Sequence, residues 1–165
     1  MKTSPEEALV RAVYQSNSLI SRTEGAFRAE LASILETSAR RNPKLGITGV
    51  LIYDRGRWVQ LLEGPAASVD ALLDDIEDDL RHALFQILWR TPAATRMFEQ
   101  WSMAFMNADA APLPANAETS WERAGPMELD ARLAFAADHL SEFSVPASDR
   151  PIDVRRRFHQ RPACA

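Results

Sequence analysis

Residues 47–64, which read ITGVLIYDRGRWVQLLEG, determine how the rest of the chain can be placed. Two runs of strand-forming residues, 47–53 and 57–63, lie on either side of Asp54, Arg55 and Gly56. Aspartate and glycine are typical of the tight turns that join antiparallel strands. We therefore predict a β-hairpin in this part of the chain.

The segment before the hairpin predicts one strand and one helix. Residues 9–16 include Leu, Val and Tyr without clean alternation, which suits a strand covered on both faces. Ser21 and Glu24 have the spacing of a helix capping box, and apolar positions then recur at helical intervals up to residue 38. We expect the pair Asn42-Pro43 to end this helix, because proline has no backbone N–H to donate.

The segment after the hairpin predicts a second helix and two more strands. Apolar residues recur at helical spacing from 69 to 80, and residues 85–89 and 97–106 have the composition of strands. The order βαββαββ is that of the ferredoxin-like arrangement with one added strand. The predicted fold class is therefore α+β, with a five-stranded mixed sheet and two helices on one face.

Helical patterns near the C-terminus are expected to cover the other face of the sheet. Residues 121–128 and 127–143 supply apolar positions for this purpose, and an open face needs such a cover. We therefore divide the chain into a domain at 1–106, a helical cap at 107–144 and a tail at 145–165. The tail contains three prolines and a run of three arginines, Arg155 to Arg157, and is expected to be flexible.

The composition argues against several kinds of partner. A net charge of −4, from 19 Lys and Arg against 23 Asp and Glu, gives no general basic surface, so no direct nucleic-acid partner is expected. The single cysteine, Cys164, excludes an intrachain disulfide, and no spacing of metal ligands is present. We find no signal peptide and no membrane-spanning stretch, and we therefore expect a cytoplasmic protein with no membrane partner.

Alternation along the strands predicts a polar cluster between the sheet and the two helices. Side chains of a strand alternate between its faces, so positions of one parity share a face. On this basis the helix-facing positions are Ala12, Tyr14, Ser16, Trp58, Gln60, Leu62, Trp101, Met103 and Phe105. Ser38 and Asn42 are four residues apart and continue the apolar face of the first helix.

Gln60 is the most informative of these positions. A primary amide inside the apolar run Trp-Val-Gln-Leu-Leu costs roughly 1–3 kcal/mol if it has no partner. A structural hydrogen bond with Tyr14 would satisfy it, and Trp101 and Met103 could be ordinary core residues. The same groups also suit the edge of a flavin ring, where amides accept from the ring N–H and donate to its carbonyls and its unprotonated nitrogen.

Several short motifs, in their order and spacing, resemble those of the BLUF family of blue-light sensors that use FAD. The motifs are residues 14–16 (YQS), Ser38, Asn42, 47–53 (ITGVLIY), 60–64 (QLLEG), 79–82 (DLRH) and 96–103 (RMFEQWSM). The chain resembles the short, single-domain members of this family. The resemblance covers residues 10–105 and is specific as a set, although each motif alone is weak.

The resemblance implies a flavoprotein photoreceptor rather than an enzyme. It implies FAD as the cofactor, with FMN or riboflavin as alternatives, because the motifs contact the ring and not the tail. The cofactor-binding residues would be Tyr14, Ser38, Asn42, Trp58, Gln60, Arg81 and Met103, and the photoactive residues would be Tyr14, Gln60, Trp101 and Met103. In the family, light drives electron and proton transfer from the tyrosine to the flavin. The glutamine then changes its hydrogen bonds and a reversible, red-shifted signalling state results.

The sequence also departs from the family and leaves the output open. Arg41 stands where many members have an amide or a histidine, and Trp58 is a bulky aromatic two residues before Gln60. We expect signalling through an unidentified partner protein or a homo-oligomer, because the residues after 106 are too few for an output enzyme. The main alternative is a light-insensitive interaction module on the same scaffold. A small hydrolase or flavin reductase is disfavoured, since His82, His139 and His159 are scattered.

Overall fold

The computed structural model describes residues 6–20, 23–110, 120–140 and 145–146. Its sheet contains the five expected strands, which are β1 (Leu9–Ser18), β2 (Thr48–Asp54), β3 (Arg57–Pro65), β4 (His82–Pro92) and β5 (Trp101–Asn107). A two-residue strand, β6 (Val145–Pro146), is added beside β5. The order is β4-β1-β3-β2-β5-β6, and among these described strands only β2 and β5 pair in parallel.

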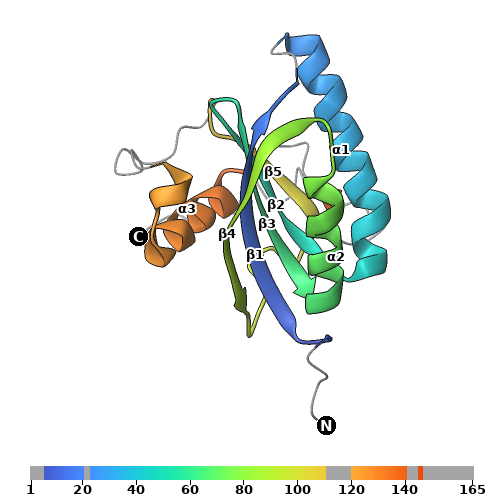
Figure 1. Ribbon diagram of the computed structural model, residues 1–165, viewed down its shortest axis with the longest axis vertical. Coiled ribbons are helices and arrows are strands. Elements are labelled where there is room, and N and C mark those ends of the chain that lie inside the picture. Colours follow the sequence, from blue (N-terminus) through green and yellow to red (C-terminus); the bar gives the residue numbers. More distant parts are fainter. Residues whose placement is uncertain (1–5, 21–22, 111–119, 141–144, 147–165) are drawn as a thin grey trace, which may run out of the picture.

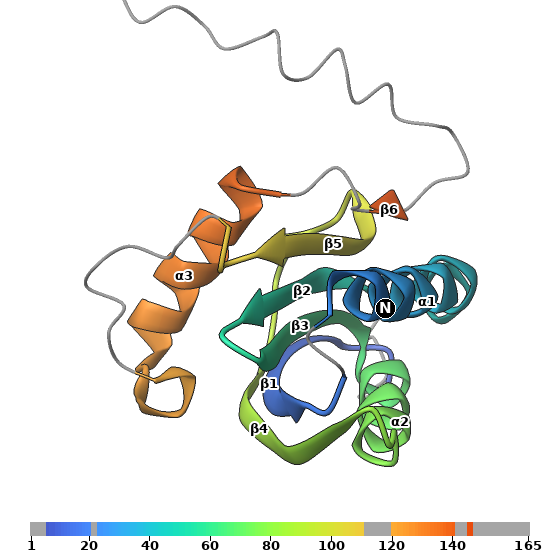
Figure 2. The ribbon, with the colours of Figure 1, turned by 90° about the horizontal axis from the view of Figure 1, so that it is seen from above.

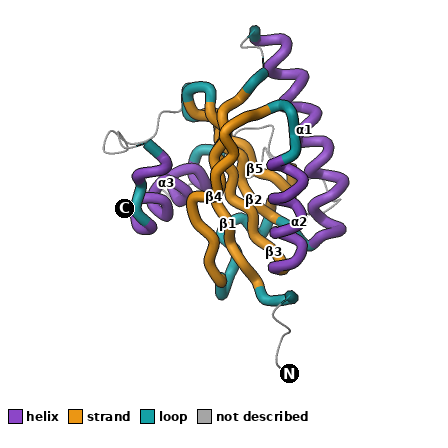
Figure 3. The backbone as a smooth tube through the Cα atoms, viewed as in Figure 1, coloured by secondary structure: helices purple, strands orange, loops and turns teal. Residues whose placement is uncertain are grey.

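Helices cover both faces of this sheet, as the sequence predicted (Figures 1 and 2). Helices α1 (Glu24–Leu45) and α2 (Ala66–Glu77) lie on one face, and α3 (Pro126–Asp138) lies on the other with a short 3-10 turn, η1 (Trp121–Arg123). Figure 3 shows the sheet as a layer between these two groups of helices. No helix within the described ranges is both long and apolar enough to span a membrane.

The turn between β2 and β3 has the geometry that the sequence predicted. Asp54 pairs with Arg57, so that two residues form the loop. Both have positive φ, 49° for Arg55 and 83° for Gly56. Positive φ at both central residues is the requirement of a type I′ turn, whose twist matches that of the flanking strands. The hairpin thereby fixes which residues of β2 and β3 face each other.

Apolar side chains form one core cluster on each face of the sheet. The cluster beneath α1 and α2 includes Ala12, Tyr14, Leu31, Leu35, Leu51, Trp58, Leu62, Val69, Met103 and Phe105. The cluster beneath α3 includes Val13, Val50, Ile52, Val59, Leu61, Phe98, Met106, Trp121, Leu129 and Leu133. Neighbouring buried positions of β1, β2 and β3 therefore fall into different clusters, as strand alternation requires. Both faces bury apolar area, which is the main stabilising contribution to the fold.

The cap is attached to the hairpin by polar contacts as well as by packing. Trp121, which is 1% exposed, donates its indole N–H to Oδ2 of Asp54 at 2.8 Å. The guanidinium carbon of Arg132 lies 4.8 Å from the centre of the Trp121 ring, and Arg132 also forms an ion pair with Glu128 on the same helix. These contacts fix the start of the cap against the end of the β2–β3 hairpin.

The structure corrects two predicted helix ends. The first helix does not stop at Asn42-Pro43 but continues to Leu45, and Gly46 ends it with a φ of 65°. Pro43 lies within the last turn, and Gly46 adopts the left-handed conformation without strain because it has no Cβ atom. The second helix ends at Glu77, so the expected core residue Leu80 lies beyond it and is 92% exposed.

The structure also differs from three further predictions, which concern a helix cap, a short helix and the C-terminal tail. The N-cap of α1 is Thr23, whose side chain makes no capping hydrogen bond, and Ser21 lies outside the described residues. The helix expected at 121–128 is only the turn η1, because α3 begins at Pro126, a residue suited to the first turn. Residues 145–146 of the expected tail pair with β5, and 147–165 lie outside the described residues.

Candidate functional site

A cavity lies between α1, α2 and the sheet, where the sequence predicted a polar cluster. The empty space between these elements, with its open mouth included, is about 750 Å³. Ile34, Leu51, Leu72 and Ile76 supply apolar walls. The polar, charged and aromatic lining residues are Tyr14, Thr37, Ser38, Arg41, Asn42, Trp58, Gln60, Asp75, Asp79, Arg81 and His82.

Tyr14, Gln60 and Met103 form a hydrogen-bonded chain at the floor of the cavity. The Tyr14 hydroxyl donates to Oε1 of Gln60 at 2.6 Å, and Nε2 of Gln60 donates to Sδ of Met103 at 3.2 Å. Register explains the first contact, because Tyr14 of β1 is directly opposite Gln60 of β3. All three side chains are at most 5% exposed. The amide of Gln60 thus connects a phenol to a thioether from a different strand.

The environment of Tyr14 keeps its phenol protonated. Burial raises the pKa of Tyr14 well above its ordinary value of 10, and the negative charge of Asp79 raises it further. Loss of the proton would leave a phenolate in a site of low polarity. The hydroxyl is therefore a hydrogen-bond donor to Gln60 at any physiological pH.

Asn42 and Ser38 bring polar groups of α1 to the cavity. Asn42 is 2% exposed, and its Nδ2 donates to the backbone carbonyl of Ser102 in β5 at 2.8 Å. This bond ties the last turn of α1 to the strand that carries Met103. An asparagine amide has a second N–H and an oxygen, which can donate to and accept from a ligand at the same edge.

The mouth of the cavity is charged, in contrast to its floor. Arg41 of α1 forms an ion pair with Asp75 of α2, and the pair bridges the two helices. Arg81 contacts both Asp79 and Glu30. Hydrogen bonds from Arg81 hold the pKa of Asp79 below its usual range, so this carboxylate stays ionised.

His82 lies beside Tyr14 and is kept neutral by its surroundings. The ring centroids of Tyr14 and His82 are 6.5 Å apart. Burial lowers the pKa of His82, and the positive charge of Arg81 lowers it further, although Asp79 opposes the change. Among the described residues, no group bonds to its buried Nδ1 atom. A neutral imidazole can offer this nitrogen to a ligand as donor or acceptor, according to its tautomer.

The lowered pKa of His82 predicts a loss of stability in mild acid. In the unfolded chain His82 takes up a proton near pH 6.5, whereas in the folded chain it does so only at lower pH. Folding therefore opposes the protonation of His82. The stabilising contribution is therefore present above about pH 6.5 and declines as the pH falls through the folded pKa. Urea titrations from pH 7.5 to 5 should show a flatter profile for His82→Gln than for the wild-type chain.

His139→Gln is the control for this experiment, because His139 is exposed at the end of α3. The difference between the two variants isolates the contribution of His82, because His139 belongs to the helix on the other face of the sheet. If His82→Gln and the wild-type chain lose stability equally between pH 7.5 and 5, the proposed neutral state of His82 is wrong.

The structure brings together most of the predicted site residues. Tyr14, Ser38, Asn42, Trp58, Gln60 and Arg81 all line the cavity, and Met103 contacts Gln60 from below. Trp58 also stacks on Phe27 of α1, with ring centroids 5.8 Å apart and planes 7° from parallel. Sequence reasoning did not identify Thr37, Asp75, Asp79 or His82 as lining residues. Helical spacing could have found Asp75 and Asp79, because they are four residues apart in and just beyond α2.

Trp101 is the predicted site residue that the structure places elsewhere. It packs against the cluster beneath α3, whereas Met103 and Phe105 face α1 and α2. The pairing of β5 with β6 shifts register between Trp101 and Met103, and the Trp101 N–H closes a turn onto the carbonyl of Phe98 at 3.0 Å. Simple alternation therefore fails at the first residue of β5, and the prediction that Trp101 shares the helix face is wrong.

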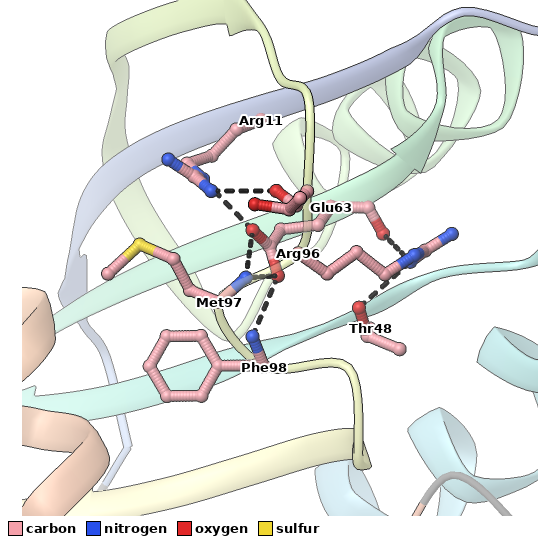
Figure 4. Close-up of polar contacts among 7 residues, drawn as sticks. Arg11, Thr48, Glu63, Arg96, Met97 and Phe98 are labelled. Carbon is pink, nitrogen blue, oxygen red and sulfur yellow. Dashed lines mark hydrogen bonds and ion pairs between the residues drawn. The ribbon is translucent and has the colours of Figure 1, made fainter.

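A buried carboxylate holds the segment that leads into β5 (Figure 4). Glu63 of β3 is completely buried, and its carboxylate accepts the backbone N–H groups of Met97 and Phe98 at 2.8–3.0 Å. Arg11 of β1, which pairs with Glu63, donates to the same carboxylate at 2.9 Å. The charge is thus satisfied by one cation and two amides, as a buried carboxylate requires.

Arg96 connects the same segment to the start of β2 and to β3. Its guanidinium donates to the Thr48 hydroxyl at 2.8 Å, to the Glu63 carbonyl at 2.7 Å and to the Gly46 carbonyl at 2.6 Å. Sequence reasoning assigned no role to Glu63 or Arg96, although both belong to quoted motifs. Together they determine where β5, and therefore Met103, enters the sheet.

The fold belongs to the class of ferredoxin-like domains, with a cavity between two helices and the sheet. A family model described as "Sensors of blue-light using FAD" matches residues 9–104, which is more than half of the chain. The chain belongs to this family, the BLUF domains. The resemblance seen in the short motifs is thereby confirmed.

Relatives of known sequence and structure agree with this assignment. The chain is 36% identical over 77 residues to photoactivated adenylate cyclase subunit beta of Euglena longa, a match over 46% of this chain and 9% of the relative. It is 28% identical to BlrB, a BLUF protein solved in its dark state, with a TM-score of 0.70 over 81% of this chain and 98% of that one. A bacterial light-regulated adenylyl cyclase is 30% identical, with a TM-score of 0.55, over 68% of this chain and 30% of that one. The chain spans about a tenth of the length of the curated relatives it matches.

The cavity residues suit the flavin that the family description names. A flavin ring is planar and mostly apolar, with carbonyl, N–H and unprotonated nitrogen groups along one edge. The cavity has apolar walls, amides at Asn42 and Gln60, and the free Nδ1 of His82. In the described part of the chain, no group of three or more His, Cys, Asp or Glu residues could hold a metal ion.

Proposed function

We propose that this chain senses blue light through a flavin, FAD by family, held between α1 and α2. Tyr14 would donate an electron and a proton to the excited flavin, and Gln60 would be the group that rearranges. The observation that carries this proposal is the 2.6 Å hydrogen bond from Tyr14 to Gln60 at the floor of the cavity. The bond connects a redox-active phenol to an amide that can rotate.

Tyr14, Gln60 and Met103 would each have a separate role in the light response. The bound flavin supplies absorption of blue light and acceptance of an electron. Tyr14 is protonated, so oxidation of its ring makes the hydroxyl strongly acidic, and Oε1 of Gln60 is the adjacent acceptor. When the Gln60 amide rotates, its Nε2 atom loses the hydrogen bond to Sδ of Met103. The rotation therefore changes a contact of β5, the strand that carries Met103. Changed hydrogen bonds from Gln60 to the bound ring would shift its absorption to the red until the amide returns.

The output is proposed to be a change in protein contacts and not a chemical conversion by this chain. Several relatives are named as light-regulated cyclases, and this chain matches only a fraction of their length. We infer that an unidentified downstream protein, or a homo-oligomer of this chain, receives the signal. The cap on the α3 face is the surface we assign to that contact, since it packs on the strands of the site.

Visible absorption of the purified protein tests the proposal. The expected result is a yellow protein whose flavin band moves reversibly to the red under blue light and returns in the dark. The spectrum is recorded before illumination, immediately after it and during recovery. A colourless protein that takes up no added FAD, or a bound flavin that is indifferent to light, would favour the light-insensitive interaction module instead.

A further inference from the structure

The polar lining of the cavity divides into an uncharged floor and a charged mouth. The floor residues Tyr14, Asn42 and Gln60 are between 2% and 5% exposed, and all three are uncharged. At the mouth, the side chains of Arg41 and Asp75 are 42% and 55% exposed. A neutral ring therefore suits the floor, and any substituent on the ring that reaches solvent must pass the charged groups.

The two arginines at the mouth differ in how many carboxylates hold them. Arg81 is bound by Asp79 through several short contacts and by Glu30 at 3.3 Å, so two carboxylates hold it. Arg41 has one ion-pair partner among the described residues, Asp75, and that carboxylate is more than half exposed. Exposed pairs of this kind are weakly stabilised, because water screens them. Arg41 can thus change partner at little cost.

We propose that Arg41 exchanges Asp75 for a phosphate of the cofactor, so that the site selects phosphorylated flavins over riboflavin. This inference rests on the proposed function. A guanidinium presents N–H groups in a planar fork that matches two phosphate oxygens, and such charge-assisted pairs are stronger than neutral hydrogen bonds. Arg41 lies one residue before Asn42, so the proposed ring contact and the phosphate contact come from the same turn of α1.

Asp75 opposes the binding of a phosphate that Arg41 is proposed to favour. The basic lining residues Arg41 and Arg81 are matched by the acidic ones Asp75 and Asp79, and Arg81 also pairs with Glu30, so the mouth has no net attraction for an anion. Asp75 both occupies Arg41 and repels phosphate. Its removal should therefore strengthen the binding of phosphorylated flavins, which is a result that a purely structural ion pair would not give.

Titration of the flavin-depleted protein with riboflavin, FMN and FAD tests the inference. Binding is followed by quenching of flavin fluorescence. Arg41→Gln should weaken FMN and FAD binding about tenfold, which is about 1.4 kcal/mol, and leave riboflavin binding within about twofold. Asp75→Asn should strengthen FMN and FAD binding and leave riboflavin unchanged. Arg41→Lys should retain part of the phosphate preference. Added salt should weaken FMN binding by the wild-type protein more than by Arg41→Gln.

Arg40→Gln is the matched control, because Arg40 is the neighbouring, exposed arginine of α1 and does not line the cavity. It removes the same charge and should leave all three affinities within about twofold. If Arg41→Gln weakens riboflavin, FMN and FAD equally, or if Arg40→Gln has the same effect as Arg41→Gln, the inference is wrong and the proposed function stands. If the wild-type chain binds none of the three flavins, the proposed function itself fails.

Discussion

Gln60→Leu is expected to abolish the reversible red shift that blue light produces in the wild-type protein. The Gln60 amide accepts from Tyr14 at 2.6 Å and donates to Met103 at 3.2 Å, so it is the group that connects the phenol to β5. Leucine fills a similar volume but can neither accept nor donate a hydrogen bond. The difference spectrum, light minus dark, should therefore be flat for a Gln60→Leu protein that still contains flavin.

Gln15→Leu is the matched control for this substitution. Gln15 follows Tyr14 in β1, is 6% exposed and bonds to Gln86, but it does not line the cavity. Each variant removes one buried amide, and a partner left unsatisfied costs roughly 1–3 kcal/mol in the free energy of unfolding. Only Gln60→Leu should remove the light response. A full red shift in flavin-loaded Gln60→Leu would show that the amide is not the switching group.

The floor of the site could be predicted from sequence because it depends on strand alternation. Tyr14 and Gln60 stand in long strands of regular register, and the hairpin turn at Arg55 and Gly56 fixes that register. The Gln60 amide lies in an apolar run, and it requires a partner because burying an amide without a hydrogen bond is costly. These two facts sufficed to predict the Tyr14–Gln60 contact, although they could not show that a cavity lies above it.

Alternation did not extend to Trp101, because β5 is not regular at its start. The turn from Phe98 to Trp101 and the shift in pairing with β6 set the side chain of Trp101 on the face of α3. The pairing with β6 joins residues more than forty positions apart, and the local turn has no distinctive sequence pattern. The position of Trp101 therefore depends on tertiary structure, and local pattern could not determine it.

The helix ends show a second limit of local pattern. Pro43 predicts the end of a helix because it cannot donate a backbone hydrogen bond, yet α1 includes it and ends at Gly46. The missing donor matters less than the left-handed conformation that ends the last turn, which glycine adopts most easily. Two termination signals three residues apart thus competed, and the conformational one was decisive.

Glu63 shows how the reasoning used for Gln60 could have been extended. It directly follows the same apolar run, and the structure shows it completely buried, so its carboxylate also requires a partner. Its partners are Arg11 and two backbone N–H groups of the segment before β5. Backbone donors in a loop have no sequence pattern, and the network could therefore be seen only in the structure.

Glu63→Ala is expected to cause the largest loss of stability of any single side-chain removal considered for this chain. It would leave the Arg11 guanidinium, whose side chain is 15% exposed, without its carboxylate, and the N–H groups of Met97 and Phe98 without an acceptor. Breaking a buried pair in this way costs about 3–5 kcal/mol. Urea unfolding followed by circular dichroism measures the loss directly.

Two further variants show whether this loss comes from the network. Glu77→Ala removes a carboxylate from an exposed position of α2 and should change the free energy of unfolding by less than about 0.5 kcal/mol. Glu63→Gln keeps the size of the side chain and one acceptor oxygen, so its loss should be intermediate. Because the network sets where Met103 enters the sheet, the light-induced red shift of Glu63→Gln should also differ from that of the wild-type protein. A loss below about 1 kcal/mol for Glu63→Ala would mean that water replaces the carboxylate, and that packing alone positions β5.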